Sequence, residues 1–259
     1  MAKVAQKYID LKNFNIKMGI LHFVQAVILF FISNDSTREI TTSYWQFNDQ
    51  TEKLEIATRT LFEVRFAWFI IVFLLLSSFF HLFVSTVGFK KYVSDLRLGM
   101  NRFRWFEYSI SASVMMVAVA MLTGIFSLGY LLAIFTLVAA MNLTGYLMEV
   151  HNQTTEKTNW SSYLVGCLLG VVPWIAIALQ LWGSGSASGV ETGPPTFVYF
   201  IFFSIFIFFN CFAINMVLQY KKTGKWSDYL YGERVYIVLS LVAKSALAWQ
   251  VYAGTLQPA

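Results

Sequence analysis

Hydrophobic and polar positions alternate along this chain in long blocks, not at the short periods of a soluble domain. Seven hydrophobic blocks are long enough to cross the ~30 Å hydrocarbon core of a bilayer as helices. They lie near residues 14–33, 65–88, 100–126, 128–149, 160–182, 196–219 and 234–256. The pattern predicts an all-α membrane protein whose residues 1–259 form a single seven-transmembrane-helix bundle.

Composition agrees with a chain that lies mostly in lipid. Hydrophobic residues make up 57% and charged residues only 13%, about half the charge of a soluble domain. The net charge is +5, but the basic residues stand between the hydrophobic blocks. They therefore indicate membrane topology and contact with membrane lipid, and no nucleic-acid partner is expected.

Most Lys and Arg residues fall in one set of loops. This set holds Lys3, Lys7, Lys12, Lys17, Lys90, Lys91, Arg97, Arg102, Arg104, Lys157, Lys221, Lys222, Lys225 and Arg234. The opposite set holds only Arg38, Lys53, Arg59 and Arg65. The positive-inside rule then predicts a cytoplasmic N-terminus and an extracellular C-terminus in the cell membrane. The long first external connection is rich in β-formers near residues 40–47, which predicts a short β-hairpin on the outer face.

A single lysine, Lys244, stands well inside the last hydrophobic block. A cationic side chain at bilayer depth costs roughly 2.5–3.5 kcal/mol, so its presence requires a reason. Burial favours the neutral amine, and a neutral amine can attack an aldehyde to form a Schiff base. Schiff-base chemistry is therefore the leading prediction for Lys244. The alternative is a lysine that snorkels to the end of its helix.

Glu107, in the third block, is the carboxylate that the pattern places deepest in the membrane. A buried cation requires an anion, so Glu107 is the predicted partner of Lys244. The alternative is an ion pair with Arg104 at the membrane edge. Four more polar residues fall in the cytoplasmic half of their blocks, namely His22, Gln25, His81 and Ser240. Two histidines at matching depth favour a functional proton network over simple hydrogen-bonded packing.

The remaining candidates are apolar residues and one small-residue motif. Several aromatic and methionine side chains are candidates to line an elongated slot, although ordinary core packing produces the same spacing: Met115, Met141, Trp174, Phe203, Phe206 and Phe209. Gly166 and Gly170 form a GxxxG pattern that permits either a dimer contact or internal packing. No phosphate-binding loop, metal-ligand spacing or nucleophile motif occurs, so no enzymatic activity is predicted.

Several segments together resemble the heliorhodopsins, which are retinal proteins with seven helices and an N-terminus inside the cell. The resemblance runs along nearly the whole chain. It is densest in Asn13-Phe14-Asn15, Phe80-His81, Phe103-Arg104-Trp105-Phe106-Glu107-Tyr108-Ser109, Val172-Pro173-Trp174-Ile175 and Gly224-Lys225-Trp226-Ser227, and it peaks in the last segment, from Gly232 to Gln250.

The resemblance implies that Lys244 binds all-trans retinal as a protonated Schiff base and that Glu107 is its counterion. It places His22, His81 and Ser240 in the polar network beside the Schiff base. By analogy with rhodopsins generally, retinal would also contact Tyr108, Ala112, Met115, Met141, Gly145, Phe206 and Asn210. Relatives of this kind are usually homodimers.

The same comparison argues against ion pumping. Pumping rhodopsins carry further carboxylates on the third helix and an aspartate four residues before the lysine, where this chain has Ser111, Ala118 and Ser240. The resulting hypothesis is a light-sensing photoreceptor. Retinal isomerises to the 13-cis form, the proton stays on the cytoplasmic side, and the basic inner loops signal to an unknown cytoplasmic partner. The alternatives are a light-driven ion transporter or channel, and a chromophore-free protein that uses the ion pair only for packing.

Overall fold

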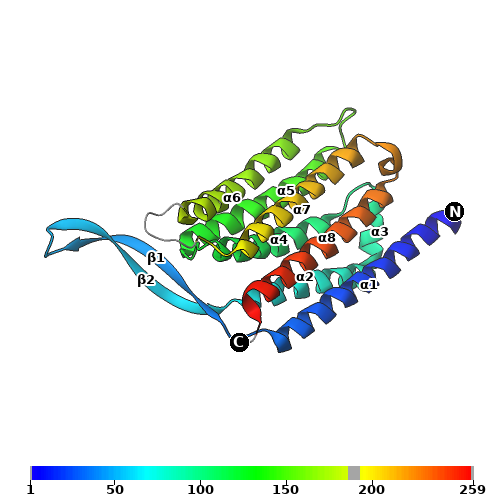
Figure 1. Cartoon of the computed structure of the whole chain (residues 1–259). Helices are drawn as coiled ribbons and strands as arrows, with labels where there is room; N and C mark the ends of the chain where they lie inside the picture. Colours follow the sequence, from blue (N-terminus) through cyan, green and yellow to red (C-terminus); the bar gives the residue numbers. More distant parts are fainter. Residues whose placement is uncertain (1, 186–192, 258–259) are drawn as a thin grey trace.

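The computed structural model describes residues 2–185 and 193–257 of the chain. They form a bundle of long helices from which a β-hairpin projects at one end (Figure 1). The elements in chain order are α1 (Ala2–Ile32), β1 (Thr37–Asn48), β2 (Lys53–Arg65), α2 (Ala67–Ser85), α3 (Phe89–Arg97), α4 (Arg102–Leu122), α5 (Leu128–His151), α6 (Ser161–Gly185), α7 (Thr196–Tyr220), the 3₁₀ turn η1 (Gly224–Ser227), α8 (Tyr229–Val251) and the π-helical turn η2 (Tyr252–Leu256).

Seven of the described helices are long and apolar enough to cross a membrane, which confirms the predicted number of spans. The predicted boundaries differ by a few residues. The third span ends at Leu122, not at 126, because Gly124 adopts a left-handed backbone with φ of 96°. The last span begins earlier than predicted, at Tyr229, because the side chain of Asp228 caps the first turn by accepting a bond from the Leu230 amide.

The predicted hairpin is confirmed, but it is longer than expected. β1 and β2 pair antiparallel from Thr37↔Arg65 to Asn48↔Lys53, with a register shift between Ile40 and Thr41. Strands of 12 and 13 residues extend well past the β-forming stretch that predicted the hairpin. Arg65 anchors its base by donating to the carbonyl oxygens of Ser33 and Asn34.

The two ends of the bundle differ in character. The N-terminus, α3 and η1 lie at one end, which carries Lys12, Lys90, Lys91, Arg97 and Lys225 and is called the basic end below (Figure 1). The hairpin and the C-terminus lie at the other end, called the hairpin end (Figure 1). A large apolar core fills the bundle toward the hairpin end, with Leu29, Phe73, Met116, Leu181 and Val251 fully or almost fully buried. Polar side chains gather nearer the basic end.

Candidate functional site

Lys244 lies inside the bundle, on α8, with only 3% of its surface exposed. Its Nζ donates to Oε1 of Glu107 at 2.5 Å and to Oγ of Ser240, one turn earlier on the same helix, at 3.0 Å. The ring of Tyr108 lies beneath the amine, 5.2 Å from Nζ to the ring centroid. A side chain with these partners does not snorkel to the helix end.

Glu107 comes from α4 and is also buried. Besides Lys244, Ser77 of α2 and Ser111 of α4 each donate to its Oε1 at 2.7 Å. Three donors on one carboxylate oxygen offset much of the cost of burying the charge, and the lysine balances it. The alternative pairing of Glu107 with Arg104 does not occur, because Arg104 contacts two other carboxylates.

The predicted histidines lie together on neighbouring helices. His22 of α1 and His81 of α2 stack with ring centroids 5.6 Å apart. The Nδ1 of His81 lies 2.7 Å from Oδ1 of Asn15. Gln25 lies elsewhere: its amide donates to the Leu21 carbonyl, and its oxygen accepts a bond from the Trp249 indole at 3.0 Å. The structure thus brings the histidines together and gives Gln25 other partners.

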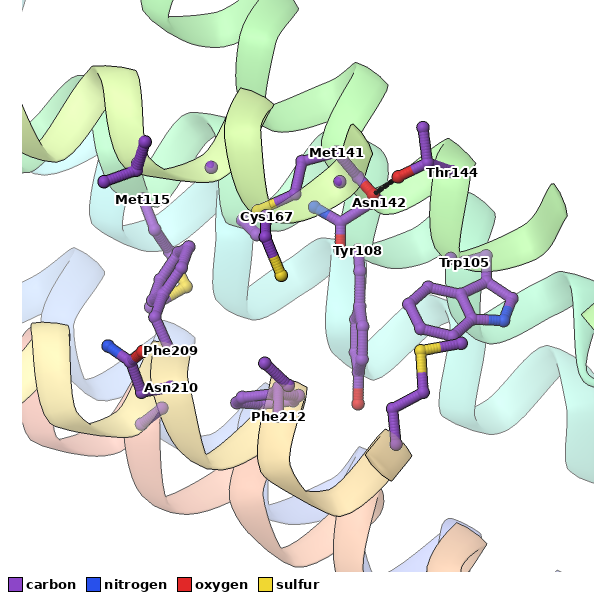
Figure 2. Close-up of a pocket in the computed structure, with 18 of the residues that line it drawn as sticks. Trp105, Tyr108, Met115, Met141, Asn142, Thr144, Cys167, Phe209, Asn210 and Phe212 are labelled. Carbon is purple, nitrogen blue, oxygen red and sulfur yellow. Dashed lines mark hydrogen bonds between the residues drawn. The ribbon is translucent and has the colours of Figure 1, made fainter. Parts of the chain in front are cut away.

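An elongated cavity of about 260 Å³ opens beside Lys244, between α4, α5, α6, α7 and α8. Its wall is mostly apolar and aromatic. In Figure 2, Met115, Tyr108 and Trp105 follow one another along α4. The helical rise between positions 105 and 115 corresponds to roughly 15 Å of cavity wall. The lining includes every predicted chromophore contact, namely Tyr108, Ala112, Met115, Met141, Gly145, Phe206 and Asn210, together with Ser240 and Lys244.

Several lining residues escaped the sequence prediction, and one candidate was wrongly placed. The additional residues include Trp105, Asn142, Thr144, Tyr163, Cys167 and Phe212. Trp174 and Phe209 line the cavity as proposed for a slot, but Phe203 does not and is 52% exposed. A Cβ added to Gly166 or Gly170 would meet Thr144 or Met141 of α5, so the GxxxG pattern serves close packing of α6 on α5.

A second buried ion cluster lies nearer the basic end, and sequence reasoning missed it. Arg104 of α4 pairs with Glu149 of α5 and with Glu233 of α8; these three residues are called the Arg104 cluster. Glu149 is 1% and Glu233 1% exposed. Glu233 was overlooked because the last span was predicted to begin at 234. The helix-capping residue Asp228 was the signal that could have extended this span.

A small cavity of about 40 Å³ lies between the two ion pairs. Glu107 and His81 form part of its wall, and Arg104 and Glu233 form another part. A space of this size holds one or a few water molecules when polar groups surround it. The Lys244–Glu107 pair therefore faces the apolar cavity through Lys244 and this smaller cavity through Glu107. The smaller one is called the polar cavity because ionisable side chains line it, beside the apolar Phe80, Val84, Phe103 and Ile237.

The structure is a seven-helix membrane bundle with a buried lysine on the last helix. A carboxylate on the third span balances this lysine, and an apolar slot opens beside it. These features together define the rhodopsin class of proteins. The solved structures support this fold. Cyanorhodopsin N4075R from the cyanobacterium Tolypothrix sp. NIES-4075 is similar, with a TM-score of 0.61 and 13% identity over 95% of this chain and 94% of that one. A search of curated protein sequences finds no match.

The family is shown by sequence. The heliorhodopsin family model matches residues 11–256, and the chain belongs to that family. It is therefore a retinal-binding, light-responsive, multi-pass membrane protein. The residues present fit this cofactor, because a buried amine opens onto an elongated apolar cavity suited to a polyene aldehyde. The roles assigned to individual site residues stay predictions.

Proposed function

We propose that this protein is a light sensor in which Lys244 holds all-trans retinal covalently as a protonated Schiff base and Glu107 is the counterion. The observation that carries this proposal is the buried pair at 2.5 Å at the wall of the apolar cavity. Bound retinal supplies the absorption of visible light and an isomerisation from all-trans to 13-cis next to the lysine.

Residues around the pair fix its geometry before light arrives. Ser77 and Ser111 hold Oε1 of Glu107 from two helices, and Ser240 holds the nitrogen of Lys244 from within α8. Tyr108 is fixed in turn, because its hydroxyl donates to the Tyr236 carbonyl at 3.1 Å. A preorganised carboxylate keeps the positive charge at the lysine nitrogen in the dark.

The proton leaves the lysine nitrogen after illumination and returns later, without crossing the membrane. This part of the proposal is supported by an asymmetry along the bundle. The histidines, Asn15 and the small polar cavity lie on the Glu107 side of the pair. Toward the hairpin end, α4 continues through the buried residues Ala118 and Ala120 into the apolar core. A proton path toward the hairpin end would need polar groups there.

We place the basic end in the cytoplasm, because Lys and Arg concentrate there. The N-terminus is then cytoplasmic, and the basic loops are available to a cytoplasmic signalling partner. We also propose a homodimer in the lipid membrane, which rests on the family resemblance alone.

The covalent link is tested with Lys244→Ala. The purified variant mixed with all-trans retinal is expected to develop no red-shifted visible band, because no other amine is buried beside the cavity among the described residues. Lys225→Ala, at an exposed position, is the matched control and is expected to colour normally. A coloured Lys244→Ala variant, or a wild-type chain without a retinal–lysine adduct by mass spectrometry, contradicts the proposal.

Transport is tested separately. Vesicles that contain the wild-type protein are illuminated while internal pH and membrane current are recorded. A sensor gives no sustained signal. Steady directional current or pH change would instead identify a light-driven transporter or channel.

A further inference from the structure

The Arg104 cluster contains two carboxylates and one guanidinium, so its formal net charge is −1 when both acids are ionised. Arg104 is the one cation that contacts Glu149 and Glu233 in the part of the chain that the structure describes. Both carboxylates are almost completely buried. A buried carboxylate in excess of its cations favours the uptake of a proton. The cluster thus contains a carboxylate that can accept one further proton.

The two carboxylates differ in the number of bonds that protonation would disturb. Glu149 accepts from the Asn101 backbone amide at 2.8 Å, the Trp105 indole at 2.7 Å and the Tyr229 hydroxyl at 3.1 Å, in addition to Arg104. Among the described residues Glu233 accepts a hydrogen bond only from the Asn101 side-chain amide, at 2.8 Å, and it forms an ion pair with Arg104. A proton on Glu233 would therefore displace fewer hydrogen-bond donors than a proton on Glu149.

The small polar cavity reaches Glu233 but not Glu149. Its wall contains the titratable and charged side chains His81, Tyr92, Arg104, Glu107, Tyr108, Glu233 and Tyr236, together with Asn15 and Asn101. The Nε of Arg104 is buried and has no hydrogen-bond partner among the described residues. A water molecule in this cavity would satisfy that donor and would lie between the Glu107 side and the Glu233 side.

We propose that Glu233 is the group that holds the proton released from Lys244 in the light, and that the polar cavity between Glu107 and Glu233 is its route. The inference rests on the proposed function, and it identifies the residue that is protonated while the lysine nitrogen is deprotonated. The lysine nitrogen gives its proton to Glu107, which lines the cavity; water held there would pass a proton on, and a carboxylate oxygen of Glu233 gains one. The return path is the same route in reverse.

The test is light-minus-dark infrared difference spectroscopy on the full chain, loaded with retinal in lipid vesicles. A carboxylate that gains a proton develops a carboxyl C=O stretching band that shifts in heavy water. We expect this band in the wild type while the lysine nitrogen is deprotonated, and we expect it to disappear in Glu233→Gln. Glutamine keeps the size of the side chain and one acceptor oxygen but cannot take up the proton.

Glu156→Gln is the matched control, because it removes an exposed carboxylate outside the Arg104 cluster. It is expected to keep the band. Glu233→Asp is a second variant that keeps an ionisable group, and its band is expected at a shifted frequency. A band that persists unchanged in Glu233→Gln and Glu233→Asp, or a wild type that deprotonates without any such band, overturns the inference.

Failure of this inference is distinguishable from failure of the proposed function. A chain that forms no visible pigment, or that pumps ions in vesicles, refutes the sensor. The other case is a protein that forms a visible pigment, completes its photocycle and transports no ions. If its carboxyl band persists in Glu233→Gln, only the assignment of the proton to Glu233 is refuted.

Discussion

Gly145 is a position where the addition of one methyl group should disturb both the cofactor cavity and the Arg104 cluster. A Cβ built on Gly145 of α5 would lie 2.6 Å from Cη2 and 2.7 Å from Cε3 of the Trp105 indole. These distances are far below ordinary van der Waals contact, so the indole must move in Gly145→Ala. Trp105 lines the cavity and donates its Nε1 proton to Glu149 at 2.7 Å. Movement of the indole therefore narrows the cofactor cavity or breaks the hydrogen bond from Trp105 to Glu149.

The magnitude follows from three contributions. Overpacking of a core costs about 1–3 kcal/mol. Loss of a hydrogen bond to a charged group costs about 1.5–3 kcal/mol. Alanine gains about 1 kcal/mol over glycine in a helix. We expect a net destabilisation of about 1.5–5 kcal/mol, which lowers Tm by about 3–20 °C for a chain of this size.

The assay is thermal unfolding of the retinal-loaded protein in detergent, followed by loss of the visible band. Gly129→Ala is the matched control on the same helix, because a Cβ there meets nothing within 4 Å. Its Tm is expected to stay the same or rise slightly. If Gly145→Ala melts at or above the temperature of Gly129→Ala, then the indole is not held where the structure places it and the reasoning is refuted.

Two further predictions concern the counterion and a tyrosine outside the spans. Glu107→Gln should move the visible absorption band to longer wavelength, because the anion that stabilises the positively charged ground state is lost; an unmoved band in the absorption spectrum would count against Glu107 as counterion. Burial raises the pKa of Tyr92, in α3, to about 12. The folded chain therefore holds this proton more tightly than the unfolded chain, so the contribution to stability is full below about pH 10 and is lost between about pH 10 and 12. Tyr92→Phe should reduce the fall in Tm over that interval, and an identical fall in both proteins would contradict the prediction.

The hydrophobic blocks were sufficient to predict the spans and the main ion pair. Block length determined the number of membrane helices, and a lone buried lysine required a buried acid, which pointed to Glu107. The cavity contacts came from the family resemblance instead. They lie on three different helices, α4, α5 and α7, and spacing along one helix says nothing about the distance between helices.

The parts that the sequence did not predict depend on helix ends and helix rotation. Glu149 and Glu233 lie near charged loop residues, where carboxylates are usually solvated, and only the packing of α4 against α5 and α8 buries them. Phe203 and Phe206 are neighbours on α7, but the rotation of that helix turns only Phe206 toward the cavity. Gln25 had the right depth but points to Trp249.

Oε1 of Glu107 connects three separate parts of the bundle through a single atom. It receives a proton donor from α2 through Ser77 and another from α8 through Lys244, while the atom itself belongs to α4. Discharging the lysine weakens the strongest of these links and leaves the serine as the remaining tie. α8 then loses its charged contact with α4 at this atom while Ser77 keeps α2 joined to it, so a change at one nitrogen acts first on the contact between α4 and α8.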